Sequence, residues 1–465
     1  MDKKISLVLV LPLLLLVSCS RFVSTEPIEK DCEHLKSFLP EVSIQFSQAI
    51  DEGLDMDDFL KLVKKTYRKG SVHRFKHSAV NENGINTDAF ANAIAWAIHN
   101  NLERKDSHIS VSSENLSIVP FCRMLPFLSD IFFEKEGDEY FVSKSNEKNL
   151  LPGMKYTGDK ENLVQEYADG KVVYRYIVFS DSLPKKGKTN ISLNNKQFTI
   201  PVRADSLKSC KGDDIWFEEN DGVLTVVIKT MKPRYDKNIE SYEVTLEKIC
   251  KQINNYSTVV FDFRDNSGGY IGRFLPILTT MIYGEIDALY DDRIKLLEDY
   301  LRTGEIDILT KTIANRRLLE GENMMAGMFY HDHKNERYYT FKEPEEKIDF
   351  SNKVFKGKIF VITNTNTCSA AEYSLAALKY IFKDDVIQLG TKTGGMLDFG
   401  GAYTYPLYES KVNIRLCFCD LSGLAVLNED SGWSGDTKGF YPDYWFFSET
   451  EENIKKFIHS NSGYF

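Results

Sequence analysis

The C-terminal half of the chain alternates between continuous apolar runs and amphipathic stretches. Four apolar runs predict buried strands, at 223–228, 258–263, 358–363 and 386–389. Amphipathic stretches at 241–253 and 369–382 predict helices between these strands. Buried strands that alternate with helices are typical of a mostly parallel sheet with helical crossovers. We therefore predict an α/β core over 213–465, with a charged helical insertion at 285–347.

The N-terminal half shows two other patterns. Apolar residues recur at helical spacing in 57–66 and 89–102, which predicts a helical domain over 31–115. From 116 to 212, short runs rich in β-branched and aromatic residues alternate with Gly and Asn turns, which predicts a small β-domain. The chain is thus expected to contain three folded parts.

A targeting signal stands at the N-terminus. Lys3 and Lys4 precede an apolar run at 5–16. The run is too short to span a membrane as a stable helix, and a positive start followed by such a run matches a secretory signal peptide. We therefore predict a signal peptide at 1–18.

Cys19 follows this signal directly. A small residue, Ser18, precedes it, and this arrangement resembles the lipidation site of bacterial lipoproteins. The mature chain would then begin with an acylated Cys19 and a tether at 19–30. It would be anchored in the bacterial cell envelope, at the outer membrane, facing the periplasm or the cell surface. The alternative is an ordinary signal peptide that is cleaved near Ser18.

The composition of the chain argues against some classes of function. The chain has 465 residues and a net charge of −10, whereas nucleic-acid binding needs a basic face, so no nucleic-acid partner is expected. Neither a P-loop lysine pattern nor a dinucleotide fingerprint occurs, and no cofactor is predicted. The eight cysteines have irregular spacings, which indicates buried thiols rather than a disulfide framework.

Three loops with unusual residues follow the predicted strands. They have the sequences Arg-Asp-Asn-Ser-Gly-Gly at 264–269, Asn-Thr-Cys-Ser-Ala-Ala-Glu at 366–372 and Gly-Thr-Lys-Thr-Gly-Gly at 390–395. Ligands of open α/β sheets bind at the carboxyl ends of the strands. The sequence therefore predicts that these loops meet and form a site.

Ser369 stands at the start of a predicted helix and allows two interpretations. One is an N-cap serine. The other is a nucleophile, because free backbone N–H groups and the positive end of the helix dipole would stabilise an alkoxide and an oxyanion. The amide of Ala370 and that of Gly268 or Gly269 would then form an oxyanion hole, since paired glycines allow a close backbone approach.

A nucleophilic serine needs a base. His108 lies in a polar turn after the helical segment, where it is either a surface histidine or that base. His331 and His333 lie close together in a polar stretch, but no third metal ligand accompanies them. No metal is therefore predicted.

Taken in order, the loops resemble those of the tail-specific (C-terminal processing) proteases. The resemblance is carried by three segments, at 259–269, 369–372 and 390–395. It covers the predicted core, and the helical part more weakly. It implies a core akin to the crotonase and Clp protease folds. It also implies Ser369 as the nucleophile, with the amides of Gly268 or Gly269 and of Ala370 as the oxyanion hole.

The identity of the candidate base indicates which branch of this family the chain resembles. The main branch uses a lysine just after the glycine loop, where this chain has Met396. The tricorn branch instead uses a histidine preceded by a serine, which Ser107 and His108 match. It also has a carboxylate shortly before a Gly-x-x-Pro-Asp motif, which Asp436 matches with Asp in place of the usual Glu. The resemblance thus implies His108 as general base, with Ser107 and Asp436 orienting the imidazole or binding substrate.

The predicted function is a serine endopeptidase that cleaves peptide or protein substrates through an acyl-enzyme on Ser369. Relatives carry a PDZ domain where this chain has 116–212, so a PDZ-like, peptide-binding role is expected there. Two alternatives stay open. One is a serine–lysine enzyme that uses Lys392, and the other is a catalytically inactive ligand- or peptide-binding surface lipoprotein on the same fold. The sequence indicates neither the cleavage preference nor the oligomeric state.

Overall fold

The computed structural model describes most of the chain. The described residues are 26–168, 170–205, 207–208, 212–232, 239–284, 330–333, 339–342, 350–427, 431–448 and 450–462. The predicted signal peptide and Cys19 lie outside these ranges, as does most of the predicted insertion. The chain forms two compact units. The first contains the described residues up to Glu103 with Ile109–Pro120 and Ala402–Leu416, and the second contains the other described residues.

The first unit is mainly helical, as predicted. Its helices are α2 (Glu26–Val42), α3 (Ile44–Asp51), α4 (Met56–Val72) and α5 (Thr87–Asn101). Phe46 packs edge-to-face on Phe59 in its core. The α2 helix begins inside the range predicted as a tether, because Ile28 and Leu35 bury their apolar side chains. Two short strands, β1 (Ser110–Ser112) and β2 (Ser117–Ile118), pair with each other, and β1 also pairs with the first residues of β18 (Asn413–Asp420).

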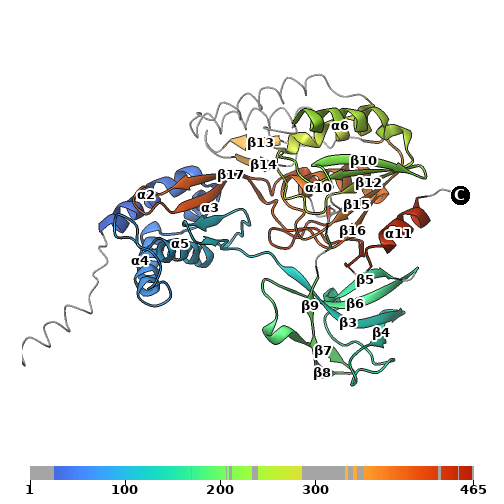
Figure 1. Ribbon diagram of the computed structural model, residues 1–465, viewed down its shortest axis with the longest axis horizontal. Helices are drawn as coiled ribbons and strands as arrows, with labels where there is room; N and C mark the ends of the chain where they lie inside the picture. Colours follow the sequence, from blue (N-terminus) through green and yellow to red (C-terminus); the bar gives the residue numbers. More distant parts are fainter. Residues whose placement is uncertain are drawn as a thin grey trace, which may run out of the picture. The chain divides into compact units, whose positions relative to one another are not determined.

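The second unit is built on one long sheet. Its strands in spatial order are β10 (Ile215–Asn220), β11 (Val223–Ile228), β12 (Thr258–Asp262), β15 (Lys358–Thr363), β16 (Val386–Gly390), β19 (Tyr444–Trp445), β5 (Leu163–Ala168), β6 (Lys171–Ser180), β3 (Leu125–Glu136) and β4 (Glu139–Ser145). The four predicted buried strands, β11, β12, β15 and β16, are neighbours and run parallel (Figure 1). The predicted α/β fold class is therefore confirmed.

Register brings the ends of these strands together. Asp262 of β12 pairs with Ile362 of β15, and Thr363 of β15 pairs with Gly390 of β16. Parallel strands in register end at one edge of the sheet. The loops that follow β12, β15 and β16 therefore start side by side, at the edge where ligands bind in such sheets.

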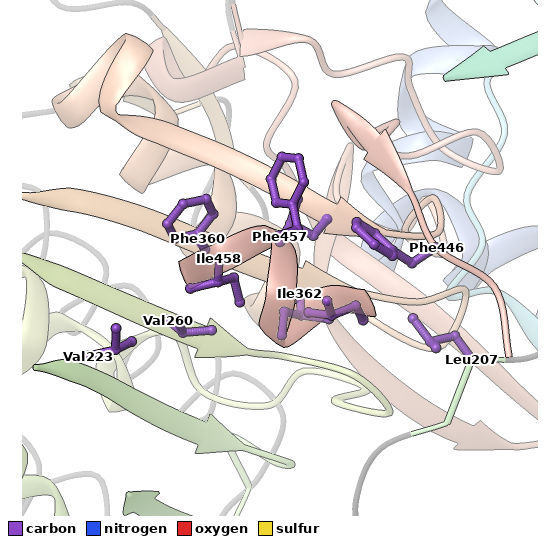
Figure 2. Packing of buried hydrophobic residues seen from close by; sticks show 10 residues of the cluster. Leu207, Val223, Val260, Phe360, Ile362, Phe446, Phe457 and Ile458 are labelled. Carbon is purple, nitrogen blue, oxygen red and sulfur yellow. The ribbon is translucent and has the colours of Figure 1, made fainter. Parts of the chain in front are cut away.

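Helices cover both faces of this part of the sheet. They are α6 (Ile239–Gln252), α7 (Leu275–Tyr283), α10 (Ala370–Phe382) and α11 (Asn453–Asn461). Phe457 of α11 belongs to the buried cluster that contains Val260 (Figure 2). Phe274, just before α7, packs on Phe261, which points to the opposite face because successive strand residues alternate. Burial on both faces explains the continuous apolar runs in the sequence.

The middle β-region is continuous with the core sheet. The short strand β19 pairs with β16 on one side and with β5 on the other, so the strands predicted as a small β-domain extend the same sheet. A hairpin of β7 (Lys188–Leu193) and β8 (Lys196–Pro201) forms a sheet of its own. The PDZ-like role of this region stays a prediction.

The predicted helical insertion contains strands where it is described. They are β13 (Tyr330–His333) and β14 (Tyr339–Lys342), which pair with each other, and β14 also pairs with β18. The helical prediction is wrong for these eight positions, since they are rich in aromatic and β-branched residues that favour strands. In the described ranges, no helix combines the length and the apolar character that crossing a membrane requires.

Candidate active site

Ser369 occupies a sharp turn between β15 and α10. Its backbone has a φ of 56° and a ψ of −121°, a left-handed conformation that costs a non-glycine residue about 1–3 kcal/mol. The preceding loop is tied to the end of β12. The Thr367 hydroxyl donates to the Phe263 carbonyl, and the Cys368 amide donates to the Asn266 carbonyl. These bonds hold the serine in a strained position at the edge of the sheet.

Glu372 fixes this turn from the first turn of α10. Its fully buried carboxylate accepts hydrogen bonds from the amides of Ser369 (2.9 Å), Gly395 (2.7 Å) and Met396 (2.8 Å), and from the Thr393 hydroxyl. Burial raises the pKa of Glu372, and these four hydrogen bonds oppose the rise. Ser369 is the N-cap residue of α10, and Glu372 joins its amide to the glycine loop after β16.

The structure brings His108 to Ser369. The imidazole Nε2 lies 3.3 Å from the serine Oγ, although the two residues are 261 positions apart in the sequence. His108 is only 6% exposed, while Ser369 is half-buried, so the pair lies where the interior meets solvent. Both residues belong to the second compact unit. A histidine this close to a serine hydroxyl is placed to take its proton.

Asp106 lies next to His108, and it was not predicted as a site residue from the sequence. Its Oδ1 accepts a hydrogen bond from the His108 amide at 2.8 Å. The same oxygen lies 3.3 Å from His108 Nδ1, an ion-pair contact without hydrogen-bond geometry. The sequence did carry a signal, because an Asp commonly accepts from the backbone N–H two residues on. That turn brings the carboxylate beside the imidazole.

Asp436 lies next to the backbone of Ser107, the residue before His108. Its carboxylate accepts hydrogen bonds from the amides of Ser107 (3.1 Å), Leu397 (2.7 Å) and Asp398 (2.9 Å). Burial, followed by the charges of two neighbouring aspartates, raises the pKa of Asp436 well above its usual range. Within the described residues, no contact joins the imidazole ring to Asp436 or to the Ser107 hydroxyl, which is buried without a partner. The two residues shape the backbone beside the histidine.

The glycine loop after β12 passes very close to the serine. A Cβ on Gly268 would lie 2.7 Å from Ser369 Cβ and 2.9 Å from the Ala370 nitrogen, closer than real side chains approach. The Gly268 amide already donates to Asn266 Oδ1 at 2.9 Å. By contrast, the amides of Gly269 and Ala370 have no acceptor among the described residues. Gly269 and Ala370 therefore fit an oxyanion hole better than Gly268 does.

Lys392, the alternative base, is engaged elsewhere. It is fully buried, and its Nζ donates to the Thr393 carbonyl at 2.6 Å. Burial lowers the pKa of Lys392 to about 8, and the charge of Glu372 opposes this fall. In the described part of the chain, no hydrogen bond joins Lys392 to Ser369. The geometry thus favours His108 as the base.

For three other residues singled out from the sequence, the structure describes no side chain. His331 and His333 are on β13, where only the backbone is described. Cys19 lies outside the described residues, so its lipidation stays a prediction.

The described core has an α/β fold, and its candidate site lies on the loops at the strand ends, where ligands bind in such sheets. Residues 222–444, just under half of the chain, match the sequence profile of Peptidase family S41. The predicted relationship to the tail-specific proteases is thereby confirmed. No curated protein gives a significant match to the chain.

Several solved structures are similar to the chain at low sequence identity. A putative peptidase from Parabacteroides merdae is 13% identical, with a TM-score of 0.37 and 92% of each chain covered. Mature CPAF in complex with lactacystin is 12% identical, with a TM-score of 0.39 and coverage of 94% of this chain and 99% of that chain. The photosystem II D1 C-terminal processing protease is 11% identical, with a TM-score of 0.35 and coverage of 91% and 94%. Similarity at this level carries no argument about substrate or mechanism.

Proposed function

We propose that the chain is a serine endopeptidase with Ser369 as its nucleophile and His108 as its general base. The match of residues 222–444 to Peptidase family S41 supports a peptidase activity. The observation that supports serine chemistry is the 3.3 Å distance between His108 Nε2 and Ser369 Oγ. A neutral imidazole at this distance activates a hydroxyl that is otherwise a weak nucleophile.

The proposed reaction has two halves, in which Ser369 is first acylated and the acyl-enzyme is then hydrolysed. His108 takes the Ser369 proton while Oγ attacks the carbonyl carbon of the peptide bond. The C–N bond then breaks, His108 gives the proton to the leaving amine, and the acyl group stays on Ser369. In the second half, His108 takes a proton from water, the resulting hydroxide attacks the ester, and the proton returns to Ser369. The amides of Gly269 and Ala370 would bind the oxyanion in both halves.

Asp106 is proposed to orient the imidazole and to stabilise its charged form. Its carboxylate lies 3.3 Å from Nδ1, so a small rotation would give a hydrogen bond from Nδ1–H. A buried carboxylate beside a histidine favours the imidazolium that forms during attack. Asp436 and Ser107 would act through the backbone, because Asp436 accepts from the Ser107 amide directly before His108.

A fluorophosphonate probe tests the nucleophile. It is expected to label the wild-type protein and to leave Ser369→Ala unlabelled, with circular dichroism showing that both are folded. A folded wild type that stays unlabelled would favour the alternative, an inactive ligand-binding or peptide-binding lipoprotein. Labelling of Ser369→Ala would place the nucleophile elsewhere.

A second set of variants tests the base. His108→Ala is expected to lower peptide turnover at least ~100-fold, the usual scale for losing a general base. His459→Ala, at an exposed histidine of α11, is the control and should leave turnover unchanged. If Lys392→Ala abolishes turnover and His108→Ala does not, the enzyme uses a serine–lysine dyad instead.

The chain is also proposed to be exported and anchored to a membrane through Cys19. The support is the positive start, the apolar run and the small residue before the cysteine. The full-length protein, expressed in a bacterial host, should partition into a detergent phase and carry an acyl mass at its N-terminus. Cys19→Ala should lose both properties. An aqueous wild type cleaved near Ser18 would show an ordinary signal peptide.

A further inference from the structure

The side chains near Ser369 also include a group of possible metal ligands. Asp106, His108 and Cys417 each place one donor atom within 4.8 Å of the other two. All three are buried, at 0%, 6% and 1% exposed. Cys417 comes from β18, and all three residues belong to the second compact unit. An imidazole nitrogen, a thiolate sulfur and a carboxylate oxygen together are a ligand set that proteins use for zinc.

Two of these donor atoms have no hydrogen-bond partner among the described residues. They are His108 Nδ1 and Asp106 Oδ2. Folded proteins rarely leave buried polar atoms unpaired, and an ion is one way to satisfy them. The Nδ1–Oδ1 separation of 3.3 Å also suits a metal. Two ligands of a tetrahedral zinc with bonds of about 2.0–2.1 Å are roughly 3.3 Å apart.

We propose that Asp106, His108 and Cys417 bind a zinc ion that inhibits the enzyme. The fourth position would hold water, and binding would release the Nδ1 proton and the thiol proton. One carboxylate and one thiolate balance the two charges of the ion.

Inhibition rests on the proposed function, whereas metal binding does not. Catalysis needs a proton on Nδ1 and a free lone pair on Nε2, which becomes protonated as Ser369 attacks. Zinc on Nδ1 replaces that proton and takes Asp106 as a ligand. Its charge then opposes protonation of Nε2, so the base is lost. The zinc is thus an inhibitor and not a cofactor.

The ligand set also predicts selectivity. A thiolate and an imidazole favour zinc and cobalt, while Mg²⁺ and Ca²⁺ prefer sites made of oxygen ligands alone. Zn²⁺ and Co²⁺ should bind, and Mg²⁺ and Ca²⁺ should neither bind nor inhibit. Inhibition by Mg²⁺ at the same concentration as Zn²⁺ would contradict a site that contains Cys417.

Metal binding is tested first, in protein that carries Ser369→Ala and no affinity tag. Cobalt bound to a thiolate gives a charge-transfer band in the near ultraviolet, and Zn²⁺ added afterwards should remove it. We expect one equivalent of Co²⁺ to give this band, Cys417→Ser to abolish it, and Cys419→Ser to keep it. Cys419 is the matched control because it lies two residues further along β18 and is equally buried.

Two results would overturn the site. One is a band that survives Cys417→Ser, and the other is a folded parent protein that gives no band. If Cys417→Ser does not fold, Asp106→Asn takes its place. This variant should raise the Zn²⁺ dissociation constant at least tenfold, as measured by calorimetry, and an unchanged constant would refute the proposal.

Inhibition is tested next, in the full active chain. Micromolar Zn²⁺ should suppress peptide hydrolysis, and a chelator should restore it. Cys417→Ser should raise the half-inhibitory zinc concentration at least tenfold without changing the rate measured in chelator. An unchanged half-inhibitory concentration would overturn the inhibition. If the Ser369→Ala protein binds cobalt through Cys417 but the wild type hydrolyses no peptide, the proposed peptidase mechanism fails while the metal site stands.

Discussion

Gly268 provides the sharpest test of how closely the backbone must approach Ser369. In Gly268→Ala, the new Cβ would lie 2.7 Å from Ser369 Cβ, 2.8 Å from the Cys368 carbonyl oxygen and 2.9 Å from the Ala370 nitrogen. The methyl group would therefore cover the Ala370 amide, where the oxyanion is proposed to bind. The backbone φ of +92° adds strain of about 1–2 kcal/mol for any residue with a Cβ.

These distances set the expected size of the effect. Loss of one oxyanion donor lowers kcat by about 10²–10³. We therefore expect Gly268→Ala to lose at least ~100-fold in kcat per folded molecule, beyond its loss of stability. The matched control is Gly153→Ala, because Gly153 has a similar φ of +84° and no atom within 4 Å of the added Cβ. The control should lose stability of about 1 kcal/mol and keep its kcat.

The assay combines hydrolysis of a fluorogenic peptide with thermal unfolding of the same samples. Circular dichroism at the assay temperature gives the folded fraction, so that kcat is expressed per folded molecule. The reasoning is refuted if Gly268→Ala keeps more than a third of the wild-type kcat. It is also refuted if Gly153→Ala loses as much activity, since backbone strain alone would then explain both results.

Four further predictions concern other parts of the second unit. Asp106→Asn should lower kcat/KM about 100-fold, because the imidazolium that forms during attack loses its negatively charged neighbour; an unchanged kcat/KM would show that Asp106 is only structural. Lys392 has its pKa lowered from 10.5 to about 8 when folded, so between these pH values the folded state binds fewer protons than the unfolded state. The free energy of unfolding of the wild type, minus that of Lys392→Met, should thus rise by about 2 kcal/mol from pH 8 to pH 10 in urea titrations, and a flat difference would contradict the burial of the charge. Glu372→Gln should cost about 2–4 kcal/mol in the same titrations, because an amide NH₂ cannot accept the hydrogen bonds that one carboxylate oxygen accepts now; a loss under 1 kcal/mol would mean that the loops hold without it. Phe457→Ala should cost about 3–5 kcal/mol and leave kcat per folded molecule unchanged, since the Phe457 ring packs on Tyr167, Tyr444 and Phe446, none of which is proposed to take part in the chemistry; a lower kcat would link that cluster to the site.

The core strands could be predicted from sequence because burial on both faces leaves a direct pattern. Val259, Val260, Phe261 and Phe263 are apolar on both sides of the pleat, and β12 is buried along its whole length. The link between the core and the middle β-region could not be predicted. It depends on Tyr444 and Trp445, a strand of two residues that is too short to show any period. The two strands at 330–333 and 339–342 were hidden for a related reason, since a charged surrounding segment dominated the pattern.

Only part of the candidate site could be predicted from the sequence, and the reasons are physical. The order of the loops singled out Ser369, and the resemblance of Ser107-His108 to the tricorn branch singled out His108; the structure places the two side chains in contact. Asp106 was overlooked, although an Asp two residues before a histidine can accept from the histidine amide and so lie beside its ring. The choice between Gly268 and Gly269 also needed coordinates. Both are glycine, and only the loop conformation decides that Asn266 takes the Gly268 amide.

The strained turn at Ser369 has a consequence for the timing of activity. The hydroxyl of Thr367 that anchors this turn bonds to Phe263, a residue 104 positions earlier in the chain. An unfolded or half-assembled polypeptide has no reason to hold a serine in this conformation, since nothing there offsets its cost. A newly made molecule would therefore be harmless to itself and to its neighbours until its central strands have joined, and latency would arise from the order of assembly alone.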